Sequence, residues 1–266
     1  MEVVAYAIAC LALKCFWALA IPITQRDANV QNFEIDGVNS KIYDPSLLYD
    51  YIPNDQVAVT DITLGIIGIA GPLAFFAICT SCVIRHEERS TSDALSAYLI
   101  STGCSEFVTE ALKRYIGRPR PNYYAMCAFD EDLLACTASQ ARINQSRKSF
   151  PSGHASLSFC AMTLTALWLL RLVVEQEIRG GKGKGTIAFV SRCFAATFLP
   201  LPLAIFTAAS RVHDNWHHTS DVVAGALIGG LSACFGFRVI FGTIDWAKVA
   251  EKRAERRGEL QILDIK

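Results

Sequence analysis

The chain has 266 residues, a hydrophobic fraction of 52% and a formal net charge of zero, because 25 basic residues balance 25 acidic ones. Its length leaves no residues for a second core, so we expect a single domain over residues 1–266. The balanced charge does not favour a polyanionic partner, and we expect no nucleic-acid binding. A positive mean hydropathy of +0.30 instead indicates lipid as the solvent.

Six apolar stretches are long enough to cross a bilayer. The clearest, "VAVTDITLGIIGIAGPLAFFAICTSCVI" at 57–84, exceeds the roughly 20 residues that a helix needs to cross about 30 Å of hydrocarbon. The other five stretches are 1–23, 93–115, 154–174, 185–208 and 219–242. The pattern predicts an all-α membrane protein with six transmembrane helices. Pro72, Pro200 and Pro202 fall inside these stretches, where we expect kinks.

The first stretch, 1–23, could instead be a cleaved signal peptide. It lacks a basic segment before its apolar run and carries Lys14 at its centre. A lysine in a retained helix can extend its ammonium group toward the interface, so we favour a retained helix.

The distribution of basic residues orients the helices. The tail after Asp245 and the loops "RHEER" and "RGGKGKG" are basic, whereas loop 24–56 has only Arg26 and Lys41. The positive-inside rule therefore predicts cytosolic termini and a cytosolic basic tail at 245–266, in either an endomembrane or the plasma membrane. Loop 116–151 is an exception, because it is also basic although the predicted topology places it outside the cytosol. Phosphate is a candidate ligand for its positive charges.

The same loop carries two candidate modifications. Cys127 and Cys136 lie in it, while the other eight cysteines fall in apolar stretches. A loop outside the cytosol permits a Cys127–Cys136 disulfide, with two free thiols as the alternative. The tripeptide "NQS" makes Asn144 a glycosylation acceptor in a eukaryotic cell.

Polar chemistry is concentrated in three clusters. They are "KRYIGRPRP" at 113–121, "PSGHAS" at 151–156 and "SRVHDNWHHTSD" at 210–221. The first two flank one loop, and two further crossings return the chain to the same side before the third. We therefore expect all three clusters to meet at one non-cytosolic membrane surface.

The clusters offer the groups that recognise phosphate. Lys113, Arg120 and Arg211 supply cations, and Ser152 and Gly153 supply donors at a helix start. The sequence has no P-loop, no HExxH motif and no carboxylate cluster for two metals, so we expect no metal or cofactor.

Histidines in these clusters suit phosphate-ester cleavage. His217 precedes Asp221 by four residues, and in a helix beginning near Trp216 the carboxylate could hold Nδ1–H and leave Nε2 as the nucleophile. His218, three residues before Asp221, is not excluded by this geometry. An adjacent phosphate dianion would keep His154 protonated, which makes it the natural general acid.

These residues resemble the type 2 phosphatidic acid phosphatase (PAP2) superfamily, the lipid phosphate phosphatases, whose helical core is shared with vanadium haloperoxidases. The three-part signature is present as Lys113, six residues and Arg120-Pro121; Pro151-Ser152-Gly153-His154; and Ser210-Arg211, five residues, His217, three residues and Asp221.

The resemblance implies a role for each of these residues. His217 would become phosphorylated, Asp221 would orient it, and His154 would protonate the leaving alkoxide and then activate water. The phosphate oxygens would be bound by Lys113, Arg120, Ser152, Gly153 and Arg211. Metal is not required.

One helix face carries additional ionisable groups. Glu106, Glu110 and Lys113 recur at spacings of four and three residues, and buried charges in membranes usually pair. We expect Glu110 to steady Lys113, with a solvated interfacial pair as the alternative.

We expect no role in catalysis for the remaining polar and small-residue segments. We expect a solvated loop face for Arg118, Arg142, Arg147 and Lys148. The segment "GALIGG" at 225–230 favours helix packing within the subunit over a dimer seam, which leaves a homo-oligomer open.

The first functional hypothesis is a lipid phosphate phosphatase acting on phosphatidate, lysophosphatidate, diacylglycerol pyrophosphate or sphingoid-base phosphates. Within the same superfamily, a polyprenyl-diphosphate or sphingoid-specific phosphatase, or a phosphotransferase, is the alternative. A catalytically silent, receptor-like membrane protein belongs to a different class. The presence of every signature residue disfavours it.

Overall fold

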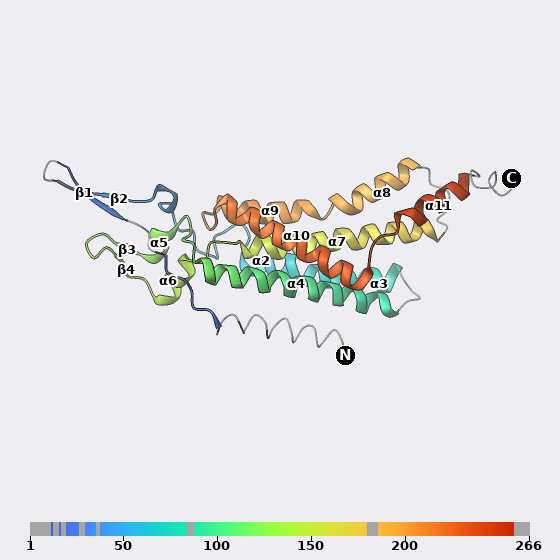
Figure 1. Ribbon diagram of the computed structural model, residues 1–266, viewed down its shortest axis with the longest axis horizontal. Coiled ribbons are helices and arrows are strands. Elements are labelled where there is room, and N and C mark those ends of the chain that lie inside the picture. The colour runs from blue at the N-terminus through green and yellow to red at the C-terminus, as the bar shows by residue number, and fades with distance from the viewer. Residues whose placement is uncertain are drawn as a thin grey trace.

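The computed structural model describes Ala12, Phe16 and residues 20–26, 30–35, 38–83, 88–179 and 186–257. The first expected span, 1–23, therefore lies almost entirely outside the described residues. The long helices run side by side as an elongated bundle, with small hairpins and short helices gathered at one end (Figure 1). Helix α11 lies at the other end (Figure 1).

The apolar stretch expected at 57–84 forms a helix of three parts. They are α2 (Asp61–Gly65), a π-helical turn η2 (Ile66–Ala70) and α3 (Gly71–Val83). Thr60 caps the start, since its hydroxyl accepts a hydrogen bond from the amide of Thr63. Pro72 lacks an N–H group and leaves the carbonyl of Gly68 without a helical donor, and the hydroxyl of Tyr98 donates to that carbonyl.

The stretch expected at 93–115 lies in α4 (Glu88–Ile116), a helix of 29 residues. It is long enough to cross a bilayer, but it is too polar to count among the candidate spans. Several of its hydroxyl side chains are buried: Ser96, Ser101, Ser105 and Thr109. Thr109 donates a hydrogen bond to the hydroxyl of Ser156 at 3.1 Å, so α4 packs through polar contacts.

Four helical segments of the described residues are long and apolar enough to cross a membrane: Asp61–Cys79, Gly153–Ile178, Thr186–His213 and Thr219–Phe241. The expected count of six is thus not reached within the described ranges. The second segment is α7 (Gly153–Ile178) and the fourth is α10 (Thr219–Phe241). The third is divided into α8 (Thr186–Phe198) and α9 (Leu201–His213). Pro200 and Pro202 stand at that break, where the sequence predicts a kink.

Aromatic and small residues hold the bundle together. Phe76 and Trp168 pack with ring centroids 5.2 Å apart in a core shared by α3, α4, α7 and α10. On α10, a Cβ added to Gly225 or Gly229 would collide with the α7 backbone, whereas one added to Gly230 would meet open space. The "GALIGG" segment therefore packs within the subunit, as the sequence predicts.

The described part of the chain also contains short strands and short helices that the six-helix prediction did not include. They are the hairpin β1 (Gln31–Ile35) and β2 (Val38–Ile42), η1 (Pro45–Leu47), α5 (Tyr123–Cys127), the two-residue strands β3 (Phe129–Asp130) and β4 (Ala135–Cys136), and α6 (Gln140–Ser146). Cys127 and Cys136 form a disulfide with Cα atoms 5.2 Å apart, beside the β3–β4 hairpin. Part of the expected tail at 245–266 forms α11 (Trp246–Arg257).

Candidate active site

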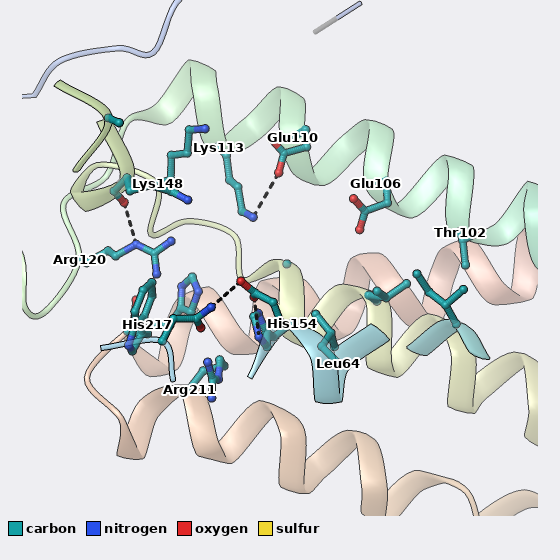
Figure 2. Close-up of a pocket in the computed structure, with 18 of the residues that line it drawn as sticks. Leu64, Thr102, Glu106, Glu110, Lys113, Arg120, Lys148, His154, Arg211 and His217 are labelled. Atoms are coloured by element: carbon teal, nitrogen blue, oxygen red, sulfur yellow. Dashed lines mark hydrogen bonds and ion pairs between the residues drawn. The ribbon is translucent and has the colours of Figure 1, made fainter. Parts of the chain in front are cut away.

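The three polar clusters surround a single cavity of about 870 Å³. The polar residues at one end of it come from α4, α7, α9 and the loops before α5, α7 and α10 (Figure 2). These residues are Glu110, Lys113, Arg120, Lys148, Gly153, His154, Arg211 and His217. The meeting of segments from 113 to 217 at one end of the bundle agrees with the expectation from counting crossings.

His217 is buried with its ring nitrogen Nδ1 2.7 Å from the carbonyl oxygen of Ser149. A carbonyl only accepts hydrogen bonds, so Nδ1 carries the proton and Nε2 keeps a free lone pair. Burial lowers the pKa of His217 to about 3, against partial opposition from Asp221, while Arg120 and Lys113 lower it further. The imidazole is therefore neutral at physiological pH, which is the nucleophilic form.

Asp221 does not hold His217 in the way that helix spacing predicts. Helix α10 begins at Thr219, after the N-cap His218, so His217 lies outside the helix and its Nδ1 stays 3.8 Å from the Asp221 carboxylate. Asp221 instead accepts a hydrogen bond from the hydroxyl of Ser149 at 2.6 Å. The carboxylate reaches His217 indirectly, because the carbonyl of the same Ser149 binds the imidazole.

His218 and Arg118 complete the surroundings of Asp221. The backbone amide of His218 donates to the carboxylate at 2.9 Å, which forms the capping box of α10. Arg118 Nη1 lies 2.6 Å from the other carboxylate oxygen. The expectation that Arg118 is a solvated loop residue is wrong, because its guanidinium contacts Asp221. The two residues lie 103 positions apart in the sequence, so no local sequence pattern reveals this contact.

His154 stands at the start of α7 and faces the cavity (Figure 2). Its Nε2 atom is buried and has no hydrogen-bond partner among the described residues. The nearest carboxylate is Asp61 at the start of α2, whose Oδ1 atom lies 3.6 Å away. Sequence reasoning missed Asp61, because it lies inside an apolar run and far from the three clusters. A buried polar atom that lacks a hydrogen bond beside a cavity indicates a ligand-binding position.

Arg211 and Arg120 are both buried beside the cavity. Arg211 Nη2 pairs with Asp214 at 2.9 Å, and its Nη1 is buried with no hydrogen-bond partner in the described part of the chain. Arg120 stacks over the ring of Trp216 at 4.6 Å and donates from Nε to the carbonyl of Gln145 at 2.8 Å. Burial lowers the pKa of Arg120 to about 10, so the guanidinium is still charged at neutral pH.

Lys113, Gly153 and Ser152 lie at the junction of α4 with α7. Lys113 Nζ is 3.3 Å from Glu110 Oε1, so the expected ion pair is present. A Cβ on Gly153 would meet Lys113 Nζ at 2.7 Å, so a larger residue there would shift the ammonium group. Ser152 does not line the cavity. Its hydroxyl instead caps α7, and its amide donates to the carbonyl of Asp221 at 2.9 Å.

Of the remaining cations near the site, two line the cavity and one does not. Lys148 and Arg142 line the cavity, and burial lowers the pKa of Lys148. Arg147 is buried with its guanidinium 5.3 Å from the ring of Tyr123 and does not line the cavity. The solvated loop face expected for these residues is therefore wrong for Arg147 and for Lys148. Asn144 is half-buried on α6, and its glycosylation stays a prediction.

The arrangement can hold a phosphate group between cations and a neutral imidazole. Lys113, Arg120, Lys148 and Arg211 line the same space as the neutral imidazole of His217. His154 presents a ring nitrogen there that has no hydrogen bond within the described residues. Among the residues that the structure describes, no three His, Cys, Asp or Glu side chains are grouped to hold a metal ion. The donor set therefore fits an anion rather than a cation.

The chain is similar in sequence to a known family and to several named phosphatases. A family model described as the PAP2 superfamily matches residues 94–245. Lipid phosphate phosphatase 2 of Arabidopsis thaliana is 32% identical over 182 residues, which are 65% of this chain and 59% of that protein. Phospholipid phosphatase 1 of Rattus norvegicus is 29% identical over 66% of this chain and 61% of its own length.

The name of a third relative specifies another substrate, diacylglycerol pyrophosphate. Probable diacylglycerol pyrophosphate phosphatase 1 of Schizosaccharomyces pombe is 30% identical over 57% of this chain and 55% of its own length. The chain thus spans less than two thirds of each of these relatives. No solved structure shows significant similarity to the chain.

Proposed function

Because the chain belongs to the PAP2 superfamily, we propose that this multi-pass membrane protein is a phosphatase that hydrolyses phosphate monoesters of lipids. The observation that carries the proposal is the position of two buried nitrogen atoms that can donate, Arg211 Nη1 and His154 Nε2, beside the neutral imidazole of His217. Neither nitrogen has a hydrogen bond among the described residues. Donors of this kind in one cavity suit a phosphate group.

The cavity also suits a lipid. Beyond the charged end its walls are mostly apolar and include Leu64, Ile69, Leu73, Leu99 and Leu157. A phosphate at the charged end would leave the acyl chain to run along these residues between the helices. Phosphatidate, lysophosphatidate, diacylglycerol pyrophosphate and sphingoid-base phosphates all have this division into a charged head and an apolar chain.

Hydrolysis would proceed in two steps at His217. First, Nε2 attacks phosphorus, an N–P bond forms, the P–O ester bond breaks, and His154 gives its proton to the leaving alkoxide. Second, a water molecule loses a proton to His154 and attacks phosphorus, the N–P bond breaks, and inorganic phosphate leaves. Both histidines return to their initial protonation states.

The cations would stabilise the charge on the transferring group. Lys113, Arg120 and Arg211 can contact its non-bridging oxygens, and the backbone of Gly153 lies beside Lys113 at the start of α7. They would supply the electrostatic stabilisation that metal ions supply in many other phosphoryl transfers, so we propose a metal-independent enzyme.

The proposed orientation places the site outside the cytosol. Basic helix α11 lies at the end of the bundle opposite the site, and the disulfide lies at the site end (Figure 1). The positive-inside rule and the redox difference across the membrane both favour this orientation.

The test is release of inorganic phosphate from a panel of these lipids by purified protein in detergent with a chelator. We expect wild-type protein to release phosphate and His217→Ala to lose at least about 10³-fold in kcat. Equal rates for both proteins would overturn the role of His217. An absolute need for added metal would overturn the metal-independent mechanism.

A further inference from the structure

One face of α4 forms a graded wall along the cavity. From the charged end inward it presents Lys113, Glu110, Glu106, Thr102 and Leu99, all of which line the cavity. Figure 2 shows the side chain of Glu106 between those of Glu110 and Thr102 and directed to the cavity. The wall thus changes from charged to mostly apolar over a few helical turns, and Glu106 is the last carboxylate along it.

The spacing places Glu106 beyond the phosphate position. Seven residues separate it from Lys113, which corresponds to about 10 Å along a helix axis. Helical side chains lean toward the N-terminus, so the carboxylate of Glu106 lies toward Thr102 and the apolar walls. A lipid with its phosphate near Lys113 would therefore bring its backbone carbons, between headgroup and acyl chain, toward Glu106.

A carboxylate at this depth restricts which substrate groups can contact it favourably. Ionised, it only accepts hydrogen bonds, and it repels other anions. Ionisable groups within a membrane bundle are costly, and they mark substrate pathways by default. An ester carbonyl offers such a group no donor, whereas a hydroxyl or an ammonium group does.

On these grounds, and on the proposed function, we propose that Glu106 is a specificity-determining residue that accepts a hydrogen bond from a hydroxyl or ammonium group on the substrate backbone, next to the phosphate ester. Lysophosphatidate carries such a hydroxyl, and sphingoid-base phosphates carry an ammonium group and a hydroxyl. Phosphatidate has both positions acylated and carries neither. The enzyme would therefore prefer single-chain lipid phosphates.

Glu110 is a poor alternative for this role. It pairs with Lys113 at 3.3 Å, and that ion pair is part of the charged end. Substitution of Glu110 would disturb the phosphate site and change the rates for every lipid. Glu106 lies one helical turn deeper, so its substitution can separate lipid selection from phosphate binding.

The test compares kcat/KM for three lipids of equal chain length: phosphatidate, lysophosphatidate and a sphingoid-base phosphate. In Glu106→Leu, the ratio of each single-chain rate to the phosphatidate rate should fall about 10-fold or more, because a hydrogen bond to a charged group is lost. Glu106→Gln keeps a carbonyl acceptor without the charge. In that variant the ratio should fall mainly for the ammonium-bearing lipid.

The outcomes separate this inference from the proposed function. If wild-type protein releases phosphate from none of the lipids, the proposed function fails. If it hydrolyses them and both variants keep the wild-type ratios, the role of Glu106 is wrong while the phosphatase stands. An equal fall in the rates for all three lipids would also contradict the inference, because it leaves the ratios unchanged.

Discussion

Both ends of the helical bundle contain arginines that contact buried groups, but the two ends use them differently. At the site end, Arg211 Nη1 and His154 Nε2 are buried and have no hydrogen bond within the part of the chain that the structure describes, although Asp61 lies 3.6 Å from His154. At the opposite end, the buried carboxylate of Glu177 lies 3.2 Å from Arg192 Nη2 and 2.9 Å from Arg253 Nη1. Arginine there joins α8 and α11 to α7.

This difference shows how a structural charge cluster can be told from a binding one. A buried charge is stable only when it is paired or bound to a ligand. Glu177 satisfies two arginines from within the chain, so that cluster needs nothing further. Arg211 forms its ion pair with Asp214 through Nη2, and Nη1 has no hydrogen bond within the described ranges. The Nη1 donor of Arg211 therefore indicates that this end of the bundle binds an anion from outside the chain.

The largest expected effect is at His154. His154→Asn removes the proposed acid and should lower kcat for lipid substrates by about 10²–10⁴-fold, with little change in KM. A p-nitrophenyl ester has a leaving group that needs no proton, so its burst phase should be affected less. A similar loss in the burst phase for both substrates would contradict the assignment of His154 as the acid.

A smaller effect is expected at Arg118, which contacts Asp221 but does not line the cavity. Arg118→Gln should lower kcat about 10-fold with KM nearly constant, because His217 is positioned through Asp221 and Ser149. Arg118→Lys keeps the charge and should recover part of the rate. If KM rises while kcat stays constant, Arg118 contacts the substrate and does not position His217.

At the opposite end, substitution should change stability and not catalysis. Glu177→Ala leaves two cations without their carboxylate and should lower the free energy of unfolding by about 1–3 kcal/mol. Glu175→Ala is the matched control, since Glu175 forms a partly exposed pair with Arg171 and should contribute under about 1 kcal/mol. Thermal unfolding in detergent measures both. A loss of kcat in folded Glu177→Ala would contradict the division between the two ends.

The smallest effect is in the pH dependence of stability. His217 has its pKa lowered to about 3 in the folded protein, whereas an unfolded histidine titrates near 6.5. Below pH of about 6.5 the unfolded chain binds a proton that the folded chain excludes, so stability falls as the pH falls toward 3. Between pH 6.5 and 5, His217→Asn should lose about 1–2 kcal/mol less than wild type. Parallel stability curves would show that His217 is not buried neutral.

Sequence patterns predicted the elements that depend on long apolar runs. Helices α7 and α10 begin within one residue of the expected positions, 154 and 219. The helical break at Pro200 was also predictable, because proline cannot donate the helical hydrogen bond. The clustering of the three motifs followed from counting crossings.

Contacts between distant segments could not be predicted in the same way. The pairing of Arg118 with Asp221, and of His154 with Asp61, depends on tertiary packing that has no periodic signal in the sequence. The role expected of Asp221 assumed a helix start near Trp216, and the three-residue difference leaves His217 outside the helix. The carbonyl of Ser149 then took the position expected for the carboxylate, a backbone contact that side-chain spacing does not reveal.

The most direct measurement of the central claim is the site of phosphorylation during turnover. Wild-type protein should be mixed with a ³²P-labelled lipid phosphate, quenched without acid, and digested to locate the label. We expect phosphate on His217 and none on His218, which caps α10 through Asp221. Label on His218, or labelling that persists in His217→Asn, would contradict the account.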